Sequence, residues 1–166
     1  PAQHKVAEQM FKCLTEKGPD NREVRRPATL SDACAVVEAT EEDVVGVIET
    51  FRKRGRSFLM PSEEVKLKGD SLIDISHESL IRNWGGNSQR KENKRLREWV
   101  EDEARSARIY RRLAETAELH REGKAGLWDD PDLSLALDWK KTNRPNKYWA
   151  RRYHRGFDTA IEFLHA

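Results

Sequence analysis

The chain has 166 residues, of which 37% are hydrophobic and 36% are charged. These values suit one ordinary domain or two small ones, with a modest core and a largely ionic surface. The 31 Lys and Arg residues nearly balance 29 Asp and Glu, and the net charge of +2 predicts no general attraction to nucleic acid or acidic membranes. No apolar run approaches the roughly 20 residues that span a bilayer, and the N-terminus has no signal-peptide pattern. We therefore predict a cytoplasmic protein without a membrane partner.

The two cysteines indicate the redox compartment of the chain, and its first residue indicates whether it is part of a longer protein. Cys13 and Cys34 lie in apolar helical patterns and lack the close spacing, to each other or to histidine, of a metal site. We expect buried free thiols in a reducing compartment. The chain begins at Pro1 without an initiator methionine, which favours a piece of a longer protein.

The N-terminal region predicts a helix followed by a short strand. Apolar residues recur at intervals of three and four over residues 4–17, and Gly18 and Pro19 end this helical pattern. Residues 23–29 have an extended pattern, which Pro27 confines to the edge of a sheet.

Two further helices are predicted next. Ser31 caps a short helix that runs through Ala39. The run at residues 40–43, Thr-Glu-Glu-Asp, resembles a capping box and opens a third helix. Four residues form the apolar face of this third helix: Val44, Val47, Ile48 and Phe51.

A hairpin completes this part of the chain. Short apolar strands at residues 58–60 and 71–75 flank a polar stretch at residues 61–70. The order helix, strand, helix, helix, hairpin is that of a winged helix, with the hairpin as the wing. We therefore predict a winged-helix domain over residues 1–84, with a three-helix core.

The second half of the chain reads as a helical linker. Residues 85–94 are polar and glycine-led, which predicts a loop or an insertion. A linker domain then covers residues 95–166, beginning with one helix of about 25 residues from Leu96, roughly twice the usual length. Gly123 and Gly126 end this long helix.

Two more helices are predicted near the C-terminus. Asp130 and Pro131 supply the cap and first residue of one helix, and Pro145 marks the break before the last. The predicted fold class is therefore mainly α: a winged helix followed by a helical linker with one long helix.

The sequence lacks the motifs that carry common enzyme chemistry. It contains no phosphate-binding loop, glycine-rich dinucleotide motif, HExxH zinc motif or GxSxG nucleophile motif. The paired carboxylates Asp129 and Asp130 precede a helix, where capping explains them better than acid–base catalysis. We therefore expect no enzyme active site within the chain.

DNA binding is the first alternative for a winged helix. Carboxylates at residues 41–43 begin the helix that would enter a major groove, and they would repel phosphate. Basic residues at 25–26 and 52–56 are the evidence in favour of DNA binding, because they could contact a DNA backbone. Pairing with a neighbouring protein domain is the commoner role of such residues. We consider DNA a disfavoured partner. A helical protein-interaction scaffold is the other alternative.

The stretch Asp-Ile-Ser-His-Glu at residues 74–78 changes from strand to helix periodicity. Ser76 can cap the helix, which places His77 in its first turn beside backbone N–H groups without helical partners. A helix start favours an anion and an imidazole can add a donor, so phosphate binding is chemically reasonable. From spacing alone, an exposed histidine without a ligand is the commoner alternative.

Four stretches resemble the segment that follows the nucleotide-binding core of bacterial STAND NTPases, which are signal-transduction ATPases related to apoptotic ATPases and plant resistance proteins. The stretches are RRPATLSDACAVVEATEEDVVGVIETFRKRGRSFLMP, IDISHESLIRNW, RLREWVEDEARSARIYRRLAETAELH and GLWDDPDLSLALDW. The resemblance covers residues 6–153 and lapses at residues 85–93, which read as an insertion.

The resemblance implies a regulatory role. In that family the winged helix folds over the ADP-loaded nucleotide domain, and a histidine in the matching motif reaches the β-phosphate. This implies that His77 is a phosphate sensor and that Glu78, which matches the acidic residue of the motif, stabilises the helix start. Ser76 stands where the plant relatives have methionine.

The resemblance also implies partners within one parent protein. These are an upstream nucleotide-binding domain, which would hold ADP or ATP, and a downstream repeat sensor; the chain itself would hold no cofactor. A signal would pull on the long helix, lift the winged helix and permit nucleotide exchange and oligomerisation. Four basic residues are candidates for interdomain contacts: Arg25, Arg26, Arg52 and Arg54.

Overall fold

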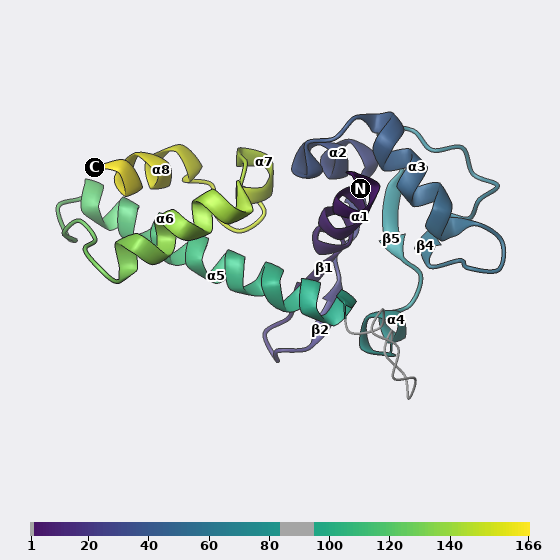
Figure 1. The fold of residues 1–166 in the computed structure, drawn as a ribbon, viewed down its shortest axis with the longest axis horizontal. Coiled ribbons are helices and arrows are strands. Elements are labelled where there is room, and N and C mark those ends of the chain that lie inside the picture. Colours follow the sequence, from purple (N-terminus) through teal and green to yellow (C-terminus); the bar gives the residue numbers. More distant parts are fainter. Residues whose placement is uncertain (1, 84–94) are drawn as a thin grey trace. The chain divides into compact units, whose positions relative to one another are not determined.

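The structure is a computed structural model that describes residues 2–83 and 95–166. Within these ranges the chain is mainly helical, with eight helices and five short strands in small antiparallel sheets, so the predicted mainly α class is confirmed (Figure 1). Contacts divide the chain into two compact units, residues 1–103 (unit 1) and 104–166 (unit 2). The predicted loop at residues 85–94, with its insertion at 85–93, lies outside the described residues.

The first helix is shorter than predicted, and a hairpin follows it. Helix α1 (Ala2–Cys13) ends before strand β1 (Thr15–Lys17), which pairs antiparallel with strand β2 (Glu23–Arg25). The hydroxyl of buried Thr15 donates to the carbonyl of Phe11 at 2.8 Å and closes the helix. The prediction of a helix through residue 17 is wrong because residues 15–17 find backbone partners across the turn.

The second helix follows a sheet edge. The predicted strand at residues 23–29 is two strands in separate sheets, β2 and β3 (Ala28–Thr29). Strand β3 comes directly after Pro27 and lies at the edge of its sheet, as predicted. Helix α2 (Leu30–Val37) is capped by Thr29, whose hydroxyl accepts the N–H three residues later at 3.1 Å. The prediction of Ser31 as the cap is therefore wrong. Thr29 has the extended backbone that a cap needs, whereas Ser31 is already helical.

The third helix, α3 (Glu41–Arg52), begins where the sequence predicts. The hydroxyl of Thr40 accepts the N–H of Asp43 at 3.2 Å and donates to its carboxylate at 2.9 Å. These bonds satisfy a backbone donor that the first turn leaves open. The predicted apolar face is confirmed, with Val44, Val47 and Ile48 buried and Phe51 half-buried.

The predicted hairpin is also confirmed. Strands β4 (Leu59–Met60) and β5 (Leu72–Ile75) pair antiparallel, and the loop between them covers residues 61–71. Strand β5 is the middle strand of a three-stranded sheet in the order β3-β5-β4. Strands β1 and β2 form a separate sheet.

Helix α4 (Glu78–Asn83) follows β5, and helix α5 (Arg95–Arg121) continues from unit 1 into unit 2. The predicted long helix is confirmed, with 27 residues. Gly123 has a φ of 73°, a left-handed conformation that suits glycine, and the chain leaves the helix there.

Unit 1 has one continuous apolar core that its helices and strands share. Phe11 is central to it, with ring centroids 4.9 Å from Phe51 and 6.2 Å from Trp99. The buried core residues are Met10, Phe11, Leu14, Leu30, Val37, Val44, Val47, Ile48, Leu59, Ile73, Ile75, Ile81, Leu96 and Val100. Burial of these side chains is the main force that holds the short strands against the helices.

Unit 2 differs from its prediction at the C-terminus. Helix α6 (Asp132–Asn143) begins one residue later than predicted, although the carboxylate of Asp130 does accept the N–H of Ser134 at 3.2 Å. The last predicted helix is two helices, α7 (Lys147–Ala150) and α8 (Phe157–His165). The intervening residues bend the chain, so aromatic spacing alone was misleading there.

Tyr110 on α5 is the centre of the unit 2 core. Its side chain is fully buried, and its ring centroid lies 5.5 Å from Trp149, 6.2 Å from Trp139 and 6.1 Å from Phe157. The phenol donates to the carbonyl of His154 at 2.8 Å, which ties α5 to the bend between α7 and α8.

This environment predicts a stability loss at alkaline pH. Burial, with the charges of Asp158 and Glu118, raises the pKa of Tyr110 to about 12, whereas an unfolded tyrosine has a pKa of about 10. The folded chain keeps the phenol proton longer, so the stabilisation present below pH ~10 is lost as pH rises toward ~12. Urea unfolding at increasing pH should show a larger loss in the wild type than in Tyr110→Phe, because lysines and the other tyrosines titrate in both proteins. Parallel profiles for the two proteins would contradict it.

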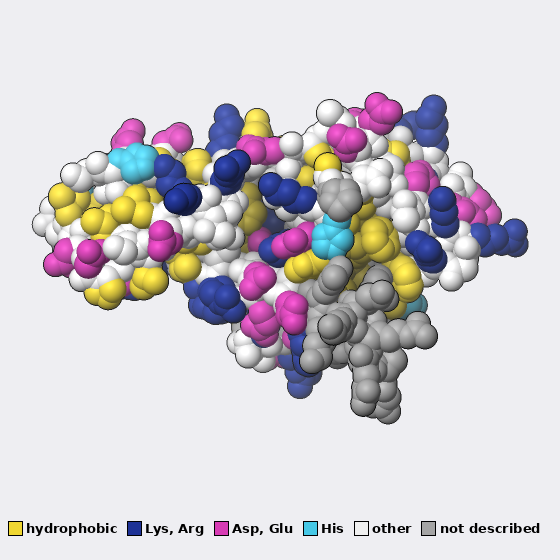
Figure 2. Space-filling model, in the orientation of Figure 1, with side chains coloured by type: hydrophobic (Ala, Val, Ile, Leu, Met, Phe, Trp, Pro, Cys, Tyr) yellow, Lys and Arg dark blue, Asp and Glu magenta, His cyan; other side chains and the backbone are white. Residues whose placement is uncertain are grey.

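Charged side chains are spread over the visible surface, with hydrophobic side chains exposed between them (Figure 2). Figure 2 shows Lys and Arg side chains interspersed with Asp and Glu over each unit, in keeping with the nearly balanced composition. Within residues 2–83 and 95–166, no helix is long and apolar enough to cross a membrane.

Candidate functional site

His77 lies at the junction between β5 and α4, in a stretch that we call the His77 segment (residues 74–80). The side chain is exposed. Helix α4 begins at Glu78, so His77 immediately precedes the helix, and the prediction of Ser76 as the cap is wrong by one residue. The backbone is held on both sides: the N–H of Ser76 donates to the carbonyl of Phe58 at 3.0 Å, and the N–H of Leu80 to the carbonyl of His77 at 3.0 Å.

Arg25 on β2 reaches this same segment. Its Nη1 donates to Oδ2 of Asp74 at 2.9 Å and to the carbonyl of Ile75 at 3.2 Å. Its Nε lies 4.0 Å from Oε1 of Glu78. The structure therefore brings together three predicted site residues, His77, Glu78 and Arg25, on neighbouring parts of unit 1.

Arg26, the next predicted contact residue, points to a different partner. Its Nη1 lies 3.3 Å from Oε2 of Glu16 on β1, within the two-stranded sheet. Arg26 lies one residue beyond the end of β2, and its side chain reaches Glu16 on β1, whereas that of Arg25 reaches the His77 segment.

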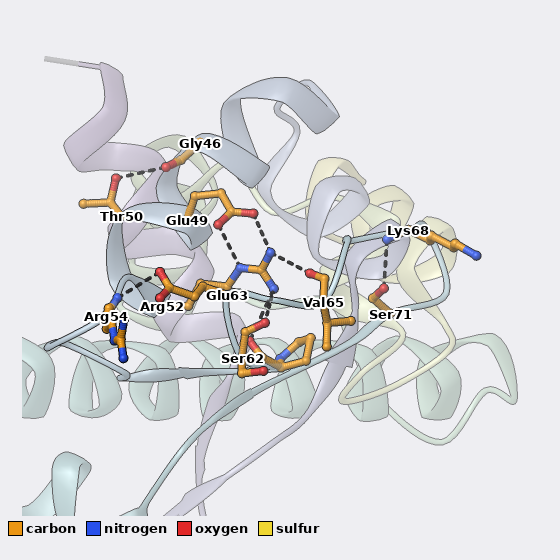
Figure 3. Close-up of polar contacts among 11 residues, drawn as sticks. Gly46, Glu49, Thr50, Arg52, Arg54, Ser62, Glu63, Val65, Lys68 and Ser71 are labelled. Carbon is orange, nitrogen blue, oxygen red and sulfur yellow. Dashed lines mark hydrogen bonds and ion pairs between the residues drawn. The ribbon is translucent and has the colours of Figure 1, made fainter.

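Arg52 is the most buried of the predicted site residues, with 3% of its surface exposed. Its guanidinium bonds twice to Glu49, at 2.6 and 2.9 Å. It also donates to three carbonyls of the following loop, those of Pro61 at 3.3 Å, Ser62 at 2.9 Å and Val65 at 2.7 Å (Figure 3). We call this set of contacts the Arg52 network. It joins the end of α3 to the loop of the hairpin.

Arg54 lies beside the same loop. Its backbone N–H donates to Oε2 of Glu63 at 3.0 Å, and its side chain is exposed (Figure 3). Among the four predicted contact residues, Arg25, Arg26 and Arg52 have acidic partners in unit 1 through their side chains, whereas Arg54 is engaged through its backbone.

Sequence reasoning did not identify Asp74 and Glu49 as partners of these arginines. Glu49 and Arg52 are three positions apart on a helix, so this pair could have been predicted from spacing. Nothing local in the sequence indicates that Asp74 meets Arg25, because the two residues lie 49 positions apart.

The exposed side of α3 is acidic and forms one wall of a shallow groove. The opposite wall is the hairpin loop, and the groove is lined by Glu41, Glu42, Val45, Glu49, Lys66 and Leu67. Glu49 is paired with Arg52, which leaves the carboxylates of Glu41 and Glu42 against the ammonium group of Lys66, so the groove is a poor surface for phosphate.

The cysteines and potential metal ligands offer no second site. Cys13 is buried and Cys34 half-buried, and burial, together with the nearby charge of Glu41, raises the pKa of the Cys34 thiol. Across the described ranges, no group of three or more His, Cys, Asp or Glu residues is placed to hold a metal ion.

Comparison with known proteins gave one result. The family model nSTAND1, described as Novel STAND NTPase 1, matches residues 1–126, which include all of unit 1 and the whole of α5. Comparisons with curated proteins and with solved structures gave no match.

Proposed function

Because the chain belongs to the Novel STAND NTPase 1 family, we propose that it is a non-catalytic regulatory module of a STAND-type signalling ATPase. Unit 1 would act as the winged helix of the parent protein and unit 2 as its helical linker. Apart from the β1–β2 hairpin that follows α1, the element order α1, β3, α2, α3, β4, β5 and the three-stranded sheet β3-β5-β4 support this assignment. The module would work in the bacterial cytoplasm.

In this proposal, unit 1 folds against the ADP-loaded nucleotide domain upstream in the same parent protein. His77 contacts the β-phosphate of ADP, and Glu78 stabilises the start of α4. A signal from a downstream repeat sensor acts through α5, separates unit 1 from the nucleotide domain and permits exchange for ATP and oligomerisation. The ligand shifts the balance between two states because it contacts His77 in only one of them.

The observation that carries the proposal is the placement of His77. Its side chain is exposed, while the backbone before and after it is held by the contacts of Ser76 and Leu80. An imidazole on a fixed backbone loses little freedom when it binds, which favours recognition of a phosphate oxygen. Since the chain has no phosphate-binding loop, the nucleotide would be held mainly by the other domain.

The test is ADP release from the parent protein. We expect His77→Ala to accelerate ADP dissociation by about 10- to 100-fold, because a hydrogen bond to a charged group contributes roughly 1.5–3 kcal/mol. Release of a fluorescent ADP analogue, followed by stopped flow, measures the rate. His4→Ala, which changes another exposed histidine of unit 1, should leave the rate within about twofold. An unchanged rate in His77→Ala would reject the sensor role.

The acidic groove on α3 disfavours the alternative of DNA binding. Arg52 belongs to the basic run at residues 52–56, but its guanidinium is buried in the Arg52 network and cannot reach a DNA backbone without breaking it. The DNA alternative should therefore be tested by DNA retardation with a variant that reverses the charges of Lys53 and Arg54, which are exposed, and keeps Arg52.

A further inference from the structure

We propose that Arg25 is a positioning residue for His77: it holds the strand before the histidine and the helix after it in one arrangement. This inference rests on the proposed function of His77 as a phosphate sensor. It assigns Arg25 a role inside unit 1 in place of the interdomain contact that its charge suggested.

The topology makes Arg25 a link between separate parts of the fold. Among the described residues, β2 pairs only with β1, whereas β5 pairs with β3 and β4, so no backbone ladder there joins β2 to the His77 segment. Strand β2 nevertheless packs beside α4. The side chain of Arg25 reaches from β2 to β5 and makes polar contacts between these strands of separate sheets.

The three contacts of Arg25 enclose His77 in the sequence. Asp74 and Ile75 precede the histidine, and Glu78 follows it. The other oxygen of Asp74, Oδ1, accepts the N–H of Ile75 at 2.7 Å. The carboxylate of Asp74 therefore bonds both to Arg25 and to the backbone of β5. A shift of β5 relative to α4 would break at least one of these contacts, and the direction of the His77 side chain would shift with it.

The chemistry of arginine suits this task. A guanidinium is planar, remains charged and offers five donors in fixed directions, so a single side chain can serve a carboxylate, a carbonyl and a second carboxylate. Lysine would keep the charge but not the fixed geometry. The side chain of Arg25 is 38% exposed, and those of its partners Asp74 and Glu78 are 19% and 43% exposed. Because the arginine itself remains in contact with water, these ion pairs contribute about 1 kcal/mol or less to folding stability. Loss of Arg25 should therefore loosen the His77 segment without unfolding unit 1.

The first test uses the 166-residue chain without nucleotide. We expect Arg25→Gln to speed amide hydrogen exchange at residues 76–81 by about 5-fold while the core of α3 keeps its protection, because the segment opens locally. Arg26→Gln is the matched control, since it removes the neighbouring arginine, whose partner is Glu16. Equal exchange at residues 76–81 in the two variants would overturn the proposal.

The second test uses the parent protein and separates this inference from the proposed function. We expect Arg25→Gln to accelerate ADP release by about 3- to 10-fold, Arg25→Lys by less, and the double variant with His77→Ala to release ADP no faster than His77→Ala alone. If His77→Ala accelerates release and Arg25→Gln does not, or the two effects multiply, Arg25 does not act through His77. If His77→Ala has no effect, the sensor function itself fails, and the positioning role falls with it.

Discussion

Replacing Arg52 with methionine should lower the free energy of unfolding of unit 1 by about 3 kcal/mol. Methionine can fill much of the space of the arginine stem, so the loss reports on the guanidinium. The guanidinium makes five hydrogen bonds, two to Glu49 and three to the carbonyls of Pro61, Ser62 and Val65. Without it, the loop of the hairpin loses its attachment to α3 and these carbonyls must be satisfied by water.

Hydrogen exchange measured by mass spectrometry should resolve this effect, because it reports on each segment separately. We expect residues 59–67 to lose protection first and the amides of α3 to follow at lower denaturant concentration than in the wild type. Arg54→Met removes an exposed arginine from the same region and should change stability by no more than about 0.5 kcal/mol. Similar effects of the two substitutions would show that the Arg52 network does not stabilise the unit.

Replacing Tyr110 with alanine should destabilise unit 2 by about 4 kcal/mol, the usual range for removing a large buried aromatic side chain. The substitution leaves a cavity between Trp139, Trp149 and Phe157, whose rings all lie within 6.2 Å of the tyrosine ring by centroid. It also leaves the carbonyl of His154 without the phenol that donates to it.

Exchange of the α6 and α8 amides, compared with those of α3, should localise this loss to unit 2. Tyr148→Ala is the matched control, because that tyrosine is 38% exposed and its removal should cost no more than about 0.5 kcal/mol. If Tyr110→Ala matched Tyr148→Ala, the aromatic cluster would not be the core of unit 2.

The His77 segment shows how far sequence reasoning could go towards the site. The change from alternating to helical periodicity predicted a strand that leads into a helix, and β5 and α4 confirm that order. The segment's resemblance to STAND NTPases implies a role for His77 and Glu78, and that role stays a proposal. The start of α4 was misplaced by one residue, because Ser76 is a plausible cap by type and its backbone instead bonds to Phe58.

The basic residues were harder to interpret from sequence. Arg25, Arg26, Arg52 and Arg54 lie in basic clusters of the sequence, and such clusters predict a charged surface. In the structure, Arg52 is buried, although only its spacing from Glu49 could have indicated an ion pair. The guanidinium of Arg52 can be buried because three backbone carbonyls accept its hydrogen bonds. Every residue has a backbone carbonyl, so the residue types do not indicate which ones will surround an arginine.

The sequence by itself determined the features that arise within a few residues: the cap of α3 at Thr40, the hairpin of β4 and β5, and the long helix α5. Capping, turn chemistry and helical spacing act over such short distances, so they can be read along the chain. Only the tertiary structure decided that β1 ends α1 early, that Arg25 reaches Asp74 across 49 positions, and that Tyr110 meets the carbonyl of His154 across 44. These contacts depend on how the elements pack to bury the cores, and no local pattern encodes that arrangement.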